Sequence, residues 1–200
     1  MDKLILDLRS NTGGDLSKSN LLLKYLSRRP FRLADSVYAI SRGLKPGAYL
    51  HPKLWFRLGL WLGTRRGADG RYHMRHFERH SYQPRRRHHY AGKLLVLQNG
   101  YSYSASTVVT HQLRGQPDVW IAGLESGGGD YGNSAIFLPT LVLPNSGLRL
   151  SLPLFRMVFH PTGIKGRGVP PDLLWLPQTQ AVRGQYDGTM RRALDFMRQH

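Results

Sequence analysis

The chain has 200 residues, of which 40% are hydrophobic and none is cysteine, and its formal net charge at pH 7 is +17. The lack of cysteine excludes disulfides, thiolate metal sites and a cysteine nucleophile. No apolar run approaches the roughly 18 residues that a membrane-spanning helix needs. The length and apolar content fit one domain with a sizeable core, and the positive charge favours anionic partners without bearing on the fold.

The first predicted element is a buried strand at Leu4–Leu8, an apolar run that contains a single acid. The start of the chain has neither the charged region nor the long apolar run of a signal peptide, so none is predicted. Two glycines, Gly13 and Gly14, follow the strand, and glycine permits positive φ and exposes backbone N–H groups. Such groups can form an oxyanion hole, which stabilises the negative charge of a transition state. An ordinary turn is the alternative.

A helix is predicted at Leu16–Leu26, with Asp15 or Ser17 as its cap. Residues 31–90 differ in character, because they hold thirteen Lys and Arg against three acids. The positive charge is therefore concentrated in one segment, which is predicted to form a basic, partly helical insertion or flap between two core-like parts. Within it, residues 54–62 are apolar and aromatic, which is typical of a helix that packs on a core or lies at an interface.

Two further patterns in this segment were weighed as binding sites. His73, His76 and His80 would share one helix face, but no carboxylate at a fixed spacing accompanies them, so no metal site is predicted. Arg85–Arg87 form a basic run without a nucleic-acid recognition motif, so nucleic acid is not expected as a partner. A basic module that binds nucleic acid or a membrane surface through residues 31–90 stays open as an alternative.

The most informative stretch is KLLVLQNGYSYSASTVVTHQL, residues 93–113. Residues 94–97 predict a short buried strand, and the apolar spacing beyond residue 107 predicts a helix. A sharp turn between a strand and a helix exposes a hydroxyl at the end of the sheet. The free N–H groups at the start of the helix then point toward the substrate group that the hydroxyl attacks. Three serines lie at this turn, namely Ser102, Ser104 and Ser106. Serines that act only as caps and turn formers are the alternative.

The second half of the chain alternates predicted strands with turns. Strands are expected at 119–122, 134–143, 148–152 and 154–159, with a last short one after 172. The loop at 123–133 is rich in glycine but lacks the lysine and hydroxyl residue of a phosphate-binding loop. Asp187 is predicted to cap a closing helix with an apolar face of Met190, Ala193, Leu194 and Met197.

Four segments carry a family resemblance when they are taken together and in order. They are LILDLRSNTGG (4–14), KLLVLQNGYSYSAS (93–106), WIAGLESGGG (120–129), and the pair LPNSGLRL and GRGVPPD within 143–172. This set resembles the catalytic core of the C-terminal processing, or tail-specific, serine peptidase family. The resemblance implies an α/β fold with a ClpP/crotonase-like core of ββα units. It also implies hydrolysis of peptide bonds in protein or peptide substrates, without a cofactor or metal.

Site residues follow from matching these motifs to the family. The nucleophile falls on Ser104, which also opens the predicted helix. The oxyanion hole falls on the backbone N–H groups of Gly13, Gly14 and Ala105. The neighbouring serines at 102 and 106 are predicted to be structural.

The general base departs from the family's pattern. Many members use a lysine 25 residues beyond the nucleophile, where this chain has Gly129, and residues 120–133 contain no lysine. The polar residue that assists the lysine would fall near Asn133. His160 is the candidate base that could fold back in its place. His111 lies about 10 Å along the helix from the nucleophile, too far for direct proton transfer.

In the family, a peptide-binding (PDZ-like) part and a helical part usually precede the catalytic core, and neither has a counterpart in this sequence. The chain is therefore expected to be an N-terminally truncated core over 1–200, completed by an upstream domain or a second chain. An open sheet edge at its first strand would favour self-association. The family is commonly exported, and the compartment of this chain is not predicted. Besides the basic module, two functions stay open, namely a weak or incomplete serine peptidase and an inactive homologue that holds extended peptides by strand addition.

Overall fold

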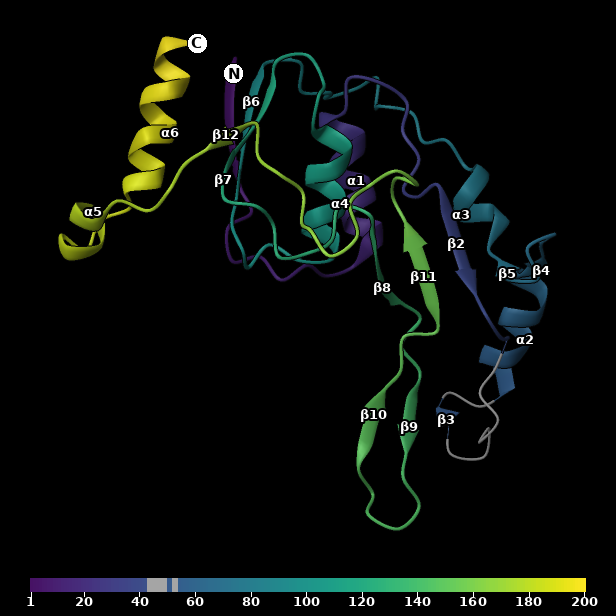
Figure 1. Ribbon diagram of the computed structural model, residues 1–200. Helices are drawn as coiled ribbons and strands as arrows, with labels where there is room; N and C mark the ends of the chain where they lie inside the picture. Colours follow the sequence, from purple (N-terminus) through teal and green to yellow (C-terminus); the bar gives the residue numbers. More distant parts are fainter. Residues whose placement is uncertain (43–49, 52–53) are drawn as a thin grey trace. The chain divides into compact units, whose positions relative to one another are not determined.

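The computed structural model describes residues 1–42, 50–51 and 54–200, which group into two compact units (Figure 1). The first unit comprises 1–31, 82–130 and 164–200, and the second comprises 32–81 and 131–163. The predicted basic insertion is thus divided, since 32–81 group with a later segment and 82–90 group with the first unit. Residues 43–49 and 52–53 of that insertion lie outside the described residues.

A four-stranded parallel sheet forms the centre of the first unit. Its order is β1 (Lys3–Asp7), β6 (Lys93–Gln98), β7 (Val119–Gly123) and β12 (Leu173–Leu174). Parallel strands that are covered on both faces consist almost entirely of apolar residues. The LLVL run of β6 fits this rule, since all four of its residues are fully buried. Helices provide the connections that parallel strands require, with α1 (Leu16–Leu26) between β1 and β6 and α4 (Ala105–Leu113) between β6 and β7.

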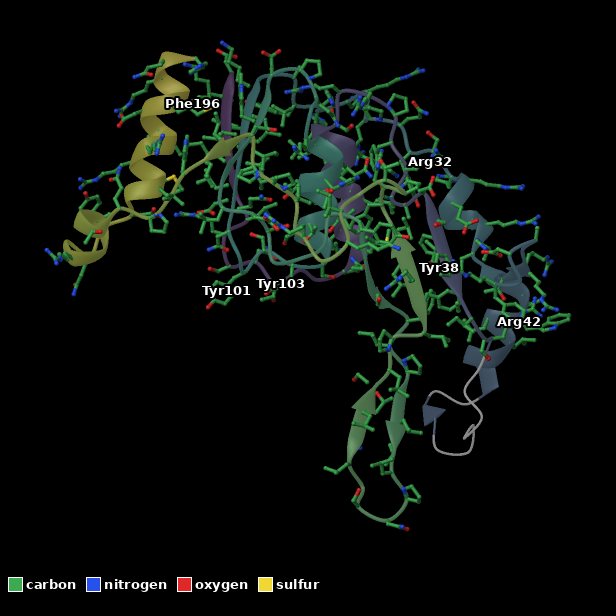
Figure 2. All side chains as sticks on the ribbon, viewed as in Figure 1. Arg32, Tyr38, Arg42, Tyr101, Tyr103 and Phe196 are labelled. Carbon is green, nitrogen blue, oxygen red and sulfur yellow. The ribbon has the colours of Figure 1, made fainter. Side chains whose placement is uncertain are left out.

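Helices cover both faces of this sheet, with α1 and α4 together on one face and α6 (Gly188–Gln199) on the other (Figure 1). The short helix α5 (Thr179–Arg183) precedes α6. Asp15 is confirmed as the cap of α1, since its side chain accepts from Ser17 N. The predicted apolar face of α6 is correct at Ala193 and Met197, which are buried against the sheet. Leu194 is 45% exposed, and Phe196 packs in its place (Figure 2).

The second unit is built on antiparallel strands. Its five-stranded sheet has the order β4 (Arg65–Arg66), β5 (Tyr72–His73), β2 (Ser36–Ala39), β11 (Phe155–Val158) and β8 (Gly132–Ile136). A second sheet has the order β10 (Arg149–Ser151), β9 (Thr140–Val142) and β3 (Leu50–His51). Val37, Phe155 and Met157 are fully buried in this unit. Its helices are α2 (Leu54–Gly63) and α3 (Arg75–Arg79).

One sequence prediction is wrong in this unit. The strand expected at 134–143 is two strands, β8 and β9, which belong to different sheets. Phe137 between them has a φ of 54°, and Pro139 lacks the N–H that a continuous strand would donate. The three histidines weighed as a metal site do not share one helix face, because His73 lies in β5, whereas His76 lies in α3. The ring nitrogens of His73 contact Glu78 at 2.7 Å and Asp69 at 3.1 Å, carboxylates that the sequence analysis had not connected with it.

In the part of the chain that the structure describes, no three or more His, Asp or Glu side chains are arranged so that they could hold a metal ion. Within the same residues, no helix is both long and apolar enough to cross a membrane. In α2, Trp61 and Leu62 are more than half exposed, whereas Leu60 is buried.

Candidate active site

The turn between β6 and α4 holds Ser104 in a backbone conformation that is rare outside glycine. Ser104 is the N-cap of α4, with φ 54° and ψ −116°. These are the angles of the first central residue of a type II′ turn, a position dominated by glycine. Holding another residue there costs about 1–3 kcal/mol and requires support from the surrounding structure. Tyr101 and Tyr103, on the same turn, are exposed and lie at the lower edge of the first unit in Figure 2.

Buried hydrogen bonds from Ser102 provide this support. The Ser102 side chain is fully buried, and its hydroxyl donates to Leu8 O at 2.8 Å. The same hydroxyl accepts from Asn99 N at 3.0 Å. The Asn99 side chain in turn accepts from Ser10 N and from Tyr101 N. The strand end before the glycine turn and the Ser104 turn are therefore joined by one network.

The Gly13–Gly14 turn lies directly against Ser104. A Cβ added to Gly13 would lie 2.7 Å from Ser104 Cβ and 2.9 Å from Ala105 N, and Gly13 has a φ of 103°. Only glycine fits this position, because both the space and the backbone angle exclude a side chain. The turn is thus close enough for its backbone to act on a group bound at Ser104.

One of the three predicted oxyanion donors is already engaged. Gly13 N donates to Asn11 Oδ1 at 2.9 Å, and the same oxygen accepts from Ser106 Oγ at 2.8 Å. Asn11 was not singled out from the sequence, although it stands inside the recognised LILDLRSNTGG segment. The structure pairs the N–H groups of Gly14 and Ala105 with no acceptor among the residues it describes. These two groups are therefore the donors available to a bound oxyanion.

A cavity of about 190 Å³ opens beside these donors. It is bordered by Gly13, Gly14 and Ala105, with apolar side chains from the strand and from both helices. The apolar lining consists of Leu8, Leu22 and Val109. The charged residues Asp15 and Lys18, at the start of α1, also border it. The cavity can accept a side chain next to a group bound at the oxyanion donors.

The glycine-rich loop at 124–130 packs against the other side of the Ser104 turn. Gly128 N donates to Ser102 O at 3.0 Å. A Cβ added to Gly128 would lie 2.0 Å from Thr107 Oγ1 and 3.2 Å from Ser104 N. These contacts were not predicted, since glycines in a loop carry no local signal of what they touch. Gly129, where the family's lysine is expected, follows immediately in the chain.

Side chains hold this loop to the segment at 166–170. Gln98 Nε2 donates to Leu124 O at 2.9 Å and to Val169 O at 2.7 Å. Arg167 donates to the Glu125 carboxylate at 2.6 Å, and Gly168 N donates to the same carboxylate. The hydrogen bond from Arg167 and that from Gly168 N lower the pKa of Glu125 to about 2. At the other end of the loop, Asp130 N donates to Arg167 O at 2.9 Å, so the loop is fixed at both its ends.

The structure does not place a base on the Ser104 hydroxyl. Among the residues described, none forms a hydrogen bond with this hydroxyl. His111 Nδ1 lies 3.2 Å from Asp130 Oδ1, so this histidine is held by the end of the glycine-rich loop. His160 and Asn133 belong to the second unit, where His160 Nδ1 lies 2.7 Å from Thr162 Oγ1. Their assignments as base and assisting residue stay predictions.

A hydroxyl on a strained strand-to-helix turn, beside two backbone N–H groups that have no acceptor among the described residues, is an arrangement that serine hydrolases use. The family model described as Peptidase family S41 matches residues 1–174. The chain therefore belongs to Peptidase family S41, in agreement with the resemblance found in its motifs. A search of curated proteins found no match.

Solved structures with the same fold share little sequence with the chain. A putative peptidase from Parabacteroides merdae is 17% identical with a TM-score of 0.64, over 98% of this chain and 52% of that protein. Mature CPAF complexed with lactacystin is 18% identical with a TM-score of 0.65, over 92% of this chain and 41% of that protein. A second structure of mature CPAF is 19% identical with a TM-score of 0.58, over 87% and 39%. The chain thus spans about half or less of the length of these neighbours.

Proposed function

We propose that the chain is a serine-type endopeptidase in which Ser104 Oγ attacks the carbonyl carbon of a peptide bond. The attack forms a tetrahedral intermediate, and its collapse expels the amine and leaves an acyl group on Ser104. Water then releases the acyl group as a carboxylate. The observation that carries the proposal is the Ser104 backbone, at φ 54° and ψ −116° at the start of a buried helix.

The N–H groups of Gly14 and Ala105 are proposed to donate to the oxyanion of the intermediate. Both border the 190 Å³ cavity, Gly14 from the glycine turn and Ala105 from the start of α4, so a substrate side chain and its carbonyl oxygen would be bound next to each other. An oxyanion donor contributes about 10²–10³ in rate. The sequence also assigned Gly13 to this role. Its N–H is bonded to Asn11, so the role proposed for Gly13 is to allow the close approach of the turn.

The Ser104 hydroxyl must give its proton to a general base, and no described residue forms a hydrogen bond with this hydroxyl. His160 is proposed as the base and Asn133 as the assisting polar residue, on the sequence argument alone. The finer fold assignment, a ClpP/crotonase-like core of ββα units, is supported by the parallel β1-β6-β7-β12 sheet with helical crossovers. Cleavage near protein C-termini is proposed from the family resemblance.

Labelling with a fluorophosphonate probe tests the nucleophile directly. The full chain is expected to incorporate the probe at Ser104, and Ser104→Ala is expected to remove the label while leaving the far-UV circular dichroism unchanged. Ser106→Ala is the matched control, because that hydroxyl lies two residues away and is bonded to Asn11. Labelling of Ser104→Ala equal to that of the parent chain would contradict the assignment. Cleavage of an unstructured protein, followed by mass spectrometry, then reports peptidase activity.

An inactive peptide-binding homologue is the second candidate, and the glycine at position 129 favours it. In that case Ser104 would hold an extended peptide beside the oxyanion donors without cleaving it. The distinguishing result is saturable binding of an unstructured peptide, measured by fluorescence anisotropy, with neither cleavage nor probe labelling. Binding unaffected by filling the cavity, for example with Val109→Trp, would argue against this use of the site.

Residues 31–90 are proposed to be a basic flap that contributes to peptide binding. Deletion of 45–81 with a short linker, which spares the residues that group with the first unit, is expected to leave that unit folded and to weaken peptide binding. A deletion variant that loses all cooperative unfolding would show that this segment belongs to the core.

A further inference from the structure

Arg9 lies between the end of β1 and the Gly13–Gly14 turn, and it joins two carboxylates. Its Nε and Nη2 donate to Asp7 at 2.9 and 2.7 Å. Its Nη1 and Nη2 donate to Asp187 at 2.8 and 2.6 Å. The Arg9 side chain is 20% exposed. Bidentate pairs of this kind are the strongest and most directional of the charge-assisted hydrogen bonds.

Asp187 is fixed independently of Arg9, because it caps α6. Its Oδ1 accepts from Met190 N at 2.8 Å. The helix that it caps is buried through Ala193 and Met197 against the sheet face formed by Leu95, Leu97 and Ala122. A carboxylate at the start of such a helix is a rigid point of attachment. The helix lies beyond residues 1–174, the part matched by the family model.

The residues that follow Arg9 build the oxyanion turn and contact the Ser104 turn. Leu8 N donates to Leu97 O at 2.8 Å, Ser10 N to Asn99 Oδ1 at 3.0 Å, and Asn11 O accepts from Tyr103 N at 3.1 Å. Ser10 has a positive φ of 58°. The segment is therefore held on one side by the nucleophile turn and, through Arg9, on the other side by α6.

We infer that Asp187 is a positioning residue for the oxyanion turn, acting through Arg9 to couple the C-terminal helix to Gly13 and Gly14. The catalytic part of this inference rests on the proposed peptidase function, whereas the structural coupling does not. Asp187 does not touch the reacting atoms. It restricts the segment at 8–14, so that the N–H groups of Gly14 and Ala105 keep a fixed separation.

The test uses the full chain with Asp187→Asn, Asp187→Glu and the control Asp195→Asn. Asparagine is as good an N-cap as aspartate, so Asp187→Asn weakens the link to Arg9 while keeping the helix start. Asp195 lies on the same helix, more than half exposed, and pairs only with Arg198 among the described residues. It therefore controls for the loss of one acid from α6.

Hydrogen exchange of the amides of Leu8, Ser10, Asn11 and Gly13 is the first measurement, since each donates a hydrogen bond in the structure. Asp187→Asn is expected to speed their exchange about tenfold, because a charge-assisted link that limits local opening is lost. Asp187→Glu is expected to restore part of the protection, and Asp195→Asn to leave it unchanged. Faster exchange confined to α6, with residues 8–13 unaffected, would overturn the inference.

The rate of fluorophosphonate labelling is the second measurement. Asp187→Asn is expected to lower the rate constant of labelling at saturating probe about tenfold without weakening probe binding. An unchanged rate constant together with faster exchange at 8–13 would overturn the catalytic part. If the parent chain takes no label, the proposed function fails, and hydrogen exchange still decides the coupling.

Discussion

Two glycine segments lie against the Ser104 turn, and they differ in what they provide. Gly13 contacts Ser104 itself, and the turn that it belongs to presents the N–H of Gly14. Gly128 contacts Thr107 and Ser104 N from the loop at 124–130, which has no ionisable side chain where the family's lysine is expected. The oxyanion donors of such a site are backbone N–H groups, and they require only that glycine allows the turn to approach closely. The acid–base part needs a particular side chain, so one substitution can remove it while the fold is kept.

The largest expected effect comes from supplying that side chain. In a His160→Ala background, which removes the proposed base, Gly129→Lys is expected to raise the rate of Ser104-dependent peptide hydrolysis by about 10²–10⁴, the usual contribution of a general base. Gly129→Gln is the matched control, since it adds a long polar side chain without a base. The measurement is cleavage of an unstructured protein at several pH values, with Ser104→Ala in the same background. Equal rates for the lysine and glutamine variants would show that the loop does not direct residue 129 to the nucleophile.

Gly13→Ala tests the other segment. We expect a loss of about 3 kcal/mol in the free energy of unfolding, because the added Cβ combines a positive φ with a clash against Ser104. Gly14→Ala is the control, since a Cβ there meets nothing within 4 Å, and its loss is expected to be smaller. Urea unfolding of both variants gives the comparison. Equal losses would mean that the close packing of Gly13 has no energetic weight.

The sequence predicted those elements whose signal is local. The strand at Leu4–Leu8, the helix at Leu16–Leu26 and the strand and helix around Ser104 agree with β1, α1, β6 and α4 to within one or two residues. Each has its periodicity and its start signal within a short window. The Asp187 cap was found for the same reason.

What the sequence did not predict depends on distant residues meeting. The pairing of β2 with β11 joins segments more than a hundred residues apart, and the sequence of neither strand indicates which strand it pairs with. The contact of Arg9 with Asp187 and that of Gly128 with Thr107 are of the same kind. In the site, motifs identified Ser104 and the Gly13–Gly14 turn. They did not identify Asn11, whose side chain occupies one of the expected donors.

A smaller effect is expected from the hydrogen-bond network that joins the end of β1 to the Ser104 turn. Ser102→Ala should lower the free energy of unfolding by about 1–3 kcal/mol, because Leu8 O and Asn99 N lose a buried partner. Thr12→Ala, which removes an exposed hydroxyl, is expected to change it by less than about 0.5 kcal/mol. Urea unfolding monitored by tryptophan fluorescence compares the two. A Ser102→Ala variant as stable as the Thr12→Ala variant would show that the network does not support the turn.

The smallest effects are expected from acid pH. Hydrogen bonds from Arg167 and from Arg9 lower the pKa of Glu125 and of Asp187 to about 2 each. Lowered carboxyl pKa values stabilise the fold above about pH 4, and this stability is lost as the pH falls toward 2. Because both groups are partly exposed, we expect less than about 1 kcal/mol from each. Glu125→Gln and Asp187→Asn should flatten the dependence of the melting temperature on pH between 4 and 2, and an unchanged slope would contradict this.

The pair Arg9–Asp187 has a consequence for the order in which the molecule is made. Its two residues are separated by 178 positions, so a ribosome has to synthesise all the residues between them before they can meet. Contacts between such distant segments form late, since the entropy of closing the loop must be overcome first. Until then, the sheet face made by Leu95, Leu97 and Ala122 has no helix over it. We expect nascent chains that end before α6 to aggregate or bind chaperones, and a competent Ser104 turn to appear only after α6 has left the ribosome.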